Sequence, residues 1–187
     1  MRNWLGCLAM LIGLCGSGAM ASAQEVAHEF SWDEAPGYYL KDEDDWLKDE
    51  LTLSRQATGE IHISVCRRHL MWGSGVVFGF QNADESITLQ LAIDCEWHEG
   101  EASMNLTAMR VEGAGADAET VDRKFGGNLA FDETHAIQLI LMENEVILQA
   151  GELQISYPVT FEIEKIWETG VGSGGTIRFF KFDPLTG

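Results

Sequence analysis

The sequence predicts an all-β protein, an antiparallel β-sandwich built from a single domain. From Gly59 to the C-terminus, short segments alternate apolar and polar residues, which is the period-two pattern of half-buried strands. Gly, Asn and Asp residues separate these segments and mark turns, and short strands cut by such turns are typical of sandwiches. No internal repeat and no linker divides residues 24–187, so we expect one domain.

The expected strands follow one another with little irregular chain between them. We expect an opening strand at 28–32 and a closing strand at 176–182, and between them strands at 60–66, 75–82, 86–97, 106–112, 135–142, 145–150 and 152–157. A phase slip within 106–112 predicts a β-bulge. The Gly-rich segment 113–127 is expected to connect two groups of strands, and 160–167 fits either a strand or a short helix. Acidic residues 42–45 are placed to begin one helical turn.

The first 23 residues predict a secretory signal peptide. Arg2 gives a positive start, an apolar run covers 4–14, and Ala21-Ser22-Ala23 forms a small-residue cleavage site. The apolar run is too short to span a bilayer, which needs about 20 residues. We therefore expect an extracytoplasmic protein, periplasmic or secreted, that does not span the membrane.

The chain is strongly acidic, with a formal net charge of −18. Such a surface repels nucleic acid, so a nucleic-acid partner is not expected. The simplest interpretation of the charge is a well-solvated surface rather than a binding site. The oligomeric state is left open.

Cys66 and Cys95 are the two cysteines that remain once the leader is removed, and in an oxidising compartment they predict one disulfide. A simple meander of the strands at 60–66, 75–82 and 86–97 argues against it, because next-but-one strands lie about 9.6 Å apart. A disulfide therefore requires that the first and third strands be neighbours or that one cysteine lie beyond its strand end. Two buried free thiols are the alternative.

The order of segments resembles the concanavalin A-like (laminin G-like) jelly rolls over about 59–183. Residues 75–91, Gly-Val-Val-Phe-Gly-Phe-Gln-Asn-Ala-Asp-Glu-Ser-Ile-Thr-Leu-Gln-Leu, look like the central strand pair of that superfamily. Residues 135–148 are similar to the strand-turn-strand that follows, and 170–182 to the last strand, which returns beside the first. Many members bind or cleave glycans, so the resemblance implies a jelly-roll fold and a role related to carbohydrate.

The strand at 87–93 presents an uninterrupted alternation. Its apolar residues are expected to face the core, while the other face carries Thr88, Gln90, Ala92, Asp94, Glu96 and His98. Paired carboxylates such as Asp94 and Glu96 suit glycoside hydrolysis. Laminarinase-type members of the superfamily carry Glu-x-Asp-x-Glu on such a strand, however, and Ala92 stands where the nucleophile would be. A solvated polar face is the simplest interpretation, and a ligand-binding face the next.

Aromatic residues in turn-like segments are the second group of candidates for ligand binding. Tyr38, Tyr39, Trp46 and Trp72 are placed where an exposed ring can stack on a sugar face. Trp97 and Trp167 lie in or beside strands and are expected to pack in the core.

Calcium is the one cofactor that the sequence leaves open. The acids at 42–45, with Asp49 and Glu50, offer oxygen ligands but lack the glycine and spacing of a dedicated loop. The five histidines show no zinc spacing. Gly170-x-Gly172-x-x-Gly175 matches a dinucleotide fingerprint but precedes a predicted strand rather than a helix, so we reject it. Asn105-Leu-Thr107 is a formal glycosylation sequon inside a predicted strand.

Three functions remain open at this stage. The first is a non-catalytic, exported jelly-roll domain that binds a glycan or another extracytoplasmic partner, with Gln90, Asp94, Glu96 and His98 in contact with it. The second is a carbohydrate-active hydrolase that uses an acid pair such as Asp94 and Glu96. The third is a structural or adhesion domain without a small ligand. On the first interpretation, replacing Asp94 or Glu96 by Ala weakens glycan binding and leaves stability nearly unchanged.

Overall fold

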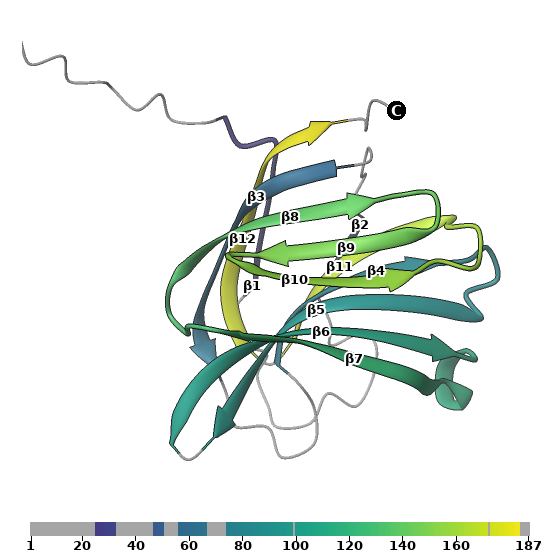
Figure 1. Ribbon diagram of the computed structural model, residues 1–187, viewed down its shortest axis with the longest axis horizontal. Coiled ribbons are helices and arrows are strands. Elements are labelled where there is room, and N and C mark those ends of the chain that lie inside the picture. The colour runs from purple at the N-terminus through teal and green to yellow at the C-terminus, as the bar shows by residue number, and fades with distance from the viewer. Residues whose placement is uncertain are drawn as a thin grey trace, which may run out of the picture.

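Two six-stranded antiparallel sheets face each other in the computed structural model (Figure 1). The structure describes residues 25–32, 47–50, 56–66, 74–98, 100–171 and 173–183. Sheet A has the order β1-β12-β3-β8-β9-β10, and sheet B has the order β2-β11-β4-β5-β6-β7. The expected antiparallel β-sandwich is confirmed. The leader at 1–23 lies outside the described residues.

Each sheet combines strands from both ends of the chain. Sheet A consists of β1 (His28–Trp32), β3 (Gln56–Cys66), β8 (Thr134–Leu141), β9 (Glu145–Ala150), β10 (Leu153–Pro158) and β12 (Ser173–Asp183). Sheet B consists of β2 (Leu47–Glu50), β4 (Ser74–Gln81), β5 (Ile87–His98), β6 (Glu101–Glu112), β7 (Glu119–Leu129) and β11 (Lys165–Val171). The closing strand β12 pairs with both β1 and β3. The expected return of the last strand beside the first is confirmed.

The core fills the space between the sheets, as the alternation predicts. Leu89, Leu91 and Ile93 of β5 are buried in it, so the expected register of this strand is confirmed. Phe78 of sheet B and Phe179 of sheet A meet across the core with ring centroids 6.2 Å apart. At one margin of the sandwich, His28 of β1 also hydrogen-bonds to the buried carboxylate of Glu168 on β11, which links the two sheets by a polar contact.

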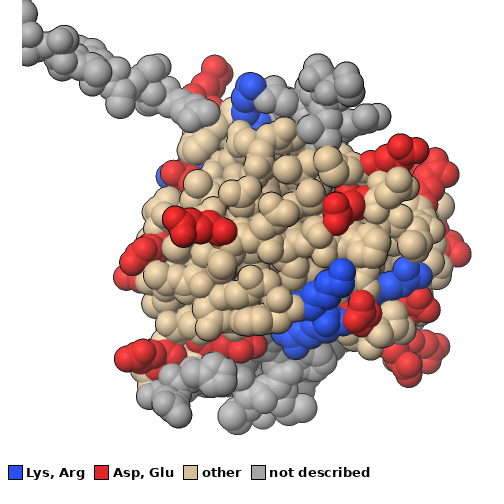
Figure 2. All heavy atoms as spheres, in the orientation of Figure 1, with Lys and Arg blue, Asp and Glu red and all other residues tan. Residues whose placement is uncertain are grey.

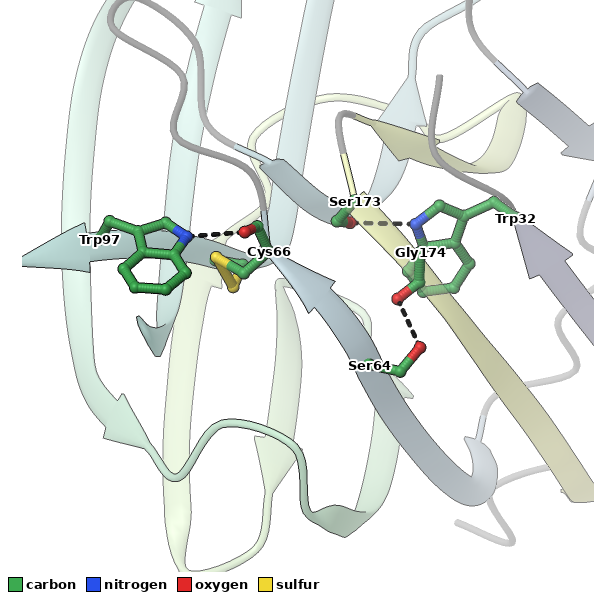
Figure 3. Close-up of a disulfide and its surroundings, with 7 residues drawn as sticks. Trp32, Ser64, Cys66, Trp97, Ser173 and Gly174 are labelled. Carbon is green, nitrogen blue, oxygen red and sulfur yellow. Dashed lines mark hydrogen bonds between the residues drawn. A yellow bond between two sulfur atoms is a disulfide. The ribbon is translucent and has the colours of Figure 1, made fainter. Parts of the chain in front are cut away.

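The disulfide between Cys66 and Cys95 is present, but the geometric objection to it rested on a wrong topology. Cys66 ends β3 in sheet A, whereas Cys95 lies on β5 in sheet B, so the two strands are in facing sheets rather than in one meander. Their Cα atoms are 5.7 Å apart, within the range that a disulfide requires. Figure 3 shows the bond crossing from one sheet to the other.

The connection expected at 113–127 was wrong. Most of the segment 113–127 belongs to β7, preceded by a short 3-10 helix at Gly115–Asp117. The sequence does not predict β7, because β7 is an edge strand whose first seven residues are all exposed, so burial imposes no alternation of apolar and polar residues on it. Residues 47–50 form the strand β2, and the helical turn expected to begin at 42–45 lies outside the described residues. The bulge expected within 106–112 lies in the partner strand instead: the register of β6 against β7 shifts at Leu106/Thr107 and Arg110/Val111, and the residues left over, Gly126 and Val121, belong to β7.

Candidate functional site: the outer face of sheet B

The outer face of sheet B is polar but largely shielded from water. Asp94 on β5 lies directly opposite Asn105 on β6 and opposite Gly75 on β4. One step along the strands, Ala92 lies between Val77 and Thr107, and Thr107 lies opposite Phe125 on β7. Asp94, Asn105 and Thr107 are all buried. The sequence interpretation of a solvated polar face is therefore wrong for the centre of this face.

Asp94 is the most constrained polar residue of this face. Only 7% of its surface is exposed, and the hydroxyl of Thr107 donates a 2.6 Å hydrogen bond to Asp94 Oδ2. Burial raises the pKa of the Asp94 carboxyl, because the charged form loses its hydration, and nearby Glu96 adds to the increase. The Thr107 hydrogen bond and the charge of Arg123 act in the opposite direction. A buried carboxyl with a raised pKa is the kind of group that gathers at functional sites.

β7 adds two exposed side chains beside this buried centre. Arg123 Nη2 lies 3.7 Å from Asp94 Oδ2, and 56% of the arginine side chain is exposed. Phe125 is 65% exposed, although it is a large apolar residue next to Thr107 in register. We call the set formed by Gln90, Asp94, Asn105, Thr107, Arg123 and Phe125 the platform. It joins a shielded group of acceptors to an accessible cation and an accessible aromatic ring.

The opposite side of the platform is closed by Trp167 of β11. Its indole lies over Gly79, where an added Cβ would come within 2.1 Å of the ring. Trp167 Nε1 donates a 2.9 Å hydrogen bond to Gln81 Oε1. Trp167 is buried as expected, but on the outer face of sheet B rather than between the sheets. Trp97 differs from expectation, because it is an exposed residue that donates to the carbonyl of Cys66 at 2.6 Å.

The structure brings together three of the residues that the sequence singled out. Gln90, Asp94 and Glu96 occupy the same face of β5, the first two within the platform. The sequence analysis expected that truncating Asp94 would leave stability nearly unchanged. Because Asp94 is buried and hydrogen-bonded, we now expect its truncation to change stability. Other candidates lie outside the residues whose side chains are described, namely His98, Tyr38, Tyr39, Trp46 and Trp72, and so do the acids at 42–45 with Asp49 and Glu50.

Four platform residues were missed by sequence reasoning: Asn105, Thr107, Arg123 and Phe125. A weak signal for the last two exists, because Val121, Arg123 and Phe125 occupy every second position, which is a strand periodicity. For Asn105 and Thr107, the sequence indicated only a formal glycosylation sequon. Nothing local in the sequence connects either pair to Asp94, since the contact depends on how β5, β6 and β7 align.

The distribution of charged side chains and of possible metal ligands bears on what the protein can bind. Figure 2 shows acidic side chains mainly around the margins of the visible face, and basic ones gathered over β6 and β7, the strands that carry Arg110, Arg123 and Lys124. Within the described residues, no three His, Cys, Asp or Glu side chains lie close enough together to hold a metal ion. In the same ranges, no helix is long and apolar enough to cross a membrane.

Known proteins resemble this chain in structure but not detectably in sequence. No family model matches it, and neither does any curated protein sequence. Galectin LEC-6 from Caenorhabditis elegans is 8% identical, with a TM-score of 0.49 over 81% of this chain and 94% of the galectin. Carbohydrate binding module CBM66 from Bacillus subtilis is 7% identical, with a TM-score of 0.42 over 70% of this chain and 73% of the module.

An enzyme is similar to about the same degree. The marine PL7 alginate lyase AlyA1 from Zobellia galactanivorans is 16% identical, with a TM-score of 0.36 over 71% of this chain. The chain spans 62% of that lyase, less than two thirds of its length. A single fold can host many unrelated functions, so likenesses of this kind decide none. The function of this chain has to be argued from its own side chains.

Proposed function

We propose that this protein binds carbohydrate on the outer face of sheet B, at the platform. The observation that carries the proposal is the placement of the exposed ring of Phe125 beside the shielded polar group around Asp94. An aromatic side chain beside a few convergent polar groups is the combination that lines binding sites for small ligands.

The chemistry of a sugar fits this combination. One face of a pyranose ring presents C–H groups that pack against an aromatic ring, while its hydroxyl groups both donate and accept hydrogen bonds. Phe125 supplies the ring, and Arg123 supplies exposed donors. Asp94, held by Thr107, supplies an acceptor in a desolvated setting, where a hydrogen bond that is left unmade is costly.

Truncation of the two exposed platform residues tests the proposal. Phe125→Ala and Arg123→Ala are each expected to weaken binding of neutral oligosaccharides by about 1–2 kcal/mol, roughly five- to thirtyfold in Kd, measured by isothermal titration calorimetry after a glycan-array screen. Neither change removes a buried group, so the folded state is expected to survive.

Two matched variants control for nonspecific effects. Val121→Ala removes another exposed apolar side chain from β7, and Arg178→Ala removes an exposed arginine from the other sheet. Both are expected to bind like the wild type. If no oligosaccharide on a broad panel binds the wild type, the carbohydrate proposal fails and a structural or adhesion domain is the better description.

A hydrolase is the second candidate, and one observation favours it. The raised pKa of Asp94 extends the pH range over which this carboxyl stays protonated, as a general acid requires, and Glu96 follows two residues later on the same strand face. The presence of Ala92 in place of a third acid argues for binding without turnover. Release of reducing ends from a β-glucan by the wild type, lost in Asp94→Asn, would favour the enzyme over the binding domain.

We also propose that the protein acts outside the cytoplasm. The disulfide between the sheets supports this location, because such bonds persist in oxidising compartments. The apolar run and small-residue site within 1–23 supply the means of export. Expression of the full chain is expected to yield an extracytoplasmic protein whose intact mass corresponds to cleavage before Gln24. Retention of residues 1–23 would contradict the signal peptide.

A further inference from the structure

A hollow lies on the outer face of sheet A, on the side of the sandwich opposite the platform. It has a volume of about 230 Å³ and is formed where β1, β12 and β3 run side by side. The residues that line it include Ser31, Trp32, His62, Ser64, Gly174 and Thr176. None of these residues belongs to the platform.

The hollow exists because β12 carries two glycines there, without side chains, and β3 is bulged, with Ser64 as its extra residue. The register against β3 shifts between Gly174 and Gly175. At Gly175 the indole of Trp32 fits closely under the strand, since an added Cβ would come within 2.9 Å of Trp32 Cζ2. Figure 3 shows Trp32 held by its hydrogen bond to Ser173, with Gly174 and Ser64 beside it. Trp32 is only 2% exposed, so its indole closes the hollow on the side of the core rather than offering a ring surface to a ligand.

The polar side chains around the hollow have hydrogen-bonding capacity left for a ligand. Ser64 donates to the carbonyl of Gly174 at 3.4 Å, so its oxygen can still accept. Ser31 and Thr176 share one hydrogen bond of 3.2 Å, which leaves one hydroxyl hydrogen and lone pairs available. His62 Nε2 donates to Asp132 at 3.2 Å, which leaves Nδ1 for a hydrogen bond to a ligand hydroxyl.

From this lining we infer that the hollow is a second ligand site, for a single neutral ring rich in hydroxyl groups. No Lys, Arg, Asp or Glu is among the described residues that line it, so a charged ligand would find no counter-ion there. Its volume is below the roughly 300–1,000 Å³ of pockets for drug-sized ligands, which suits one sugar residue or cyclic polyol rather than an oligomer.

The two sites face away from each other, because the platform is on the outer face of sheet B and the hollow on the outer face of sheet A. The second site does not need the first. If the proposed function also holds, one domain engages two glycan chains, or two parts of one chain, and gains avidity on a polysaccharide surface.

Nuclear magnetic resonance of the ¹⁵N-labelled mature protein tests the inference. The probes are the methyl glycosides of glucose, galactose and mannose and the cyclic polyol myo-inositol, each titrated separately. We expect at least one probe to give saturable shifts at the backbone amides of Ser31, Ser64, Gly174 and Thr176. Gly174→Leu fills the hollow and is expected to abolish these shifts. Ser64→Ala is expected to raise the apparent Kd about tenfold, the effect of losing one or two hydrogen bonds.

The control variants separate the two sites. Phe125→Ala on the platform and Gln154→Ala, an exposed position elsewhere in sheet A, are both expected to leave these shifts unchanged. Shifts at the hollow that persist without any binding at the platform would support this site while refuting the proposed function. The inference is overturned if no probe gives saturable shifts at these four amides. It is also overturned if Ser64→Ala binds like the wild type or if Phe125→Ala removes the shifts.

Discussion

The outer faces of the two sheets both come from strands that alternate apolar and polar residues, but the charged side chains are hydrated on sheet A and buried at the centre of sheet B. On sheet A, Glu29, Arg178 and Glu60 form a row across β1, β12 and β3, with Arg178 bonded to Glu29 at 2.6 Å and to Glu60 at 3.4 Å. Between 35% and 46% of each of these side chains is exposed. On sheet B, Asp94 is buried and bonded to Thr107.

The charges around Arg178 are hydrated, whereas the carboxyl of Asp94 is held out of water. Exposed ion pairs contribute little to stability, because water and salt screen them. The two glutamates raise the pKa of Arg178, which keeps its charge in any case. The pKa of Asp94 is raised because its charged form is disfavoured, so this carboxyl is held at a cost to the folded state. Such a cost is typical of residues retained for function.

The largest expected effect comes from the bond that fixes one sheet to the other. Replacing both Cys66 and Cys95 by Ala removes the closure of 29 residues of chain and is expected to lower the free energy of unfolding by about 3–4 kcal/mol. Denaturant titration of the two proteins measures the change. The unmodified mature protein, denatured without reductant, is expected to show no titratable thiol; two thiols per chain would contradict the bond.

A matched pair of threonines compares the two faces directly. Thr107→Val removes the donor to a buried carboxylate and is expected to cost about 1–3 kcal/mol. Thr176→Val removes a hydroxyl that bonds Ser31 in an exposed setting, and its expected effect on stability is close to zero. Urea unfolding of both variants checks the contrast. Equal costs would mean that the two faces are not different in the way that burial indicates.

The ionisation of Asp94 is expected to make the free energy of unfolding depend on pH. A carboxyl whose folded-state pKa is raised stabilises the fold while it is protonated, and this stabilisation is lost as the pH rises from the ordinary aspartate pKa through the raised value. Asp94→Asn has no such loss, so it is expected to be more stable than the wild type at neutral pH, with the difference shrinking in acid. Unfolding free energies between pH 3 and 7 test this, and a difference independent of pH would contradict it.

The smallest expected effect is that of Arg178→Ala on the outer face of sheet A. Its guanidinium is bonded to two exposed carboxylates, and both can be hydrated instead. We expect a change in stability near the error of a denaturant titration, smaller still at high salt. A clear loss of stability that persists at high salt would show that this row is more than a solvated ion pair.

Much of the architecture follows from the chain alone. The alternation at 87–93 determines which side of β5 is buried, because apolar side chains two residues apart must leave water together. β1 begins and ends where the sequence indicates, and β12 returns beside it as the resemblance implies. The pairing of Cys66 with Cys95 was one of two outcomes that the sequence left open, and the structure contains the bond.

Only the tertiary structure decided how these strands divide between two sheets and what that division brings together. The edge strand β7 carries no burial pattern, so its residues Arg123 and Phe125 gave little sign of meeting Asp94. The burial of Asp94 likewise depends on neighbours from β6 and β7 that are distant in sequence. Alternation specifies the face of a strand, but the partners on that face are set by cross-strand register, which the packing of the whole sandwich selects.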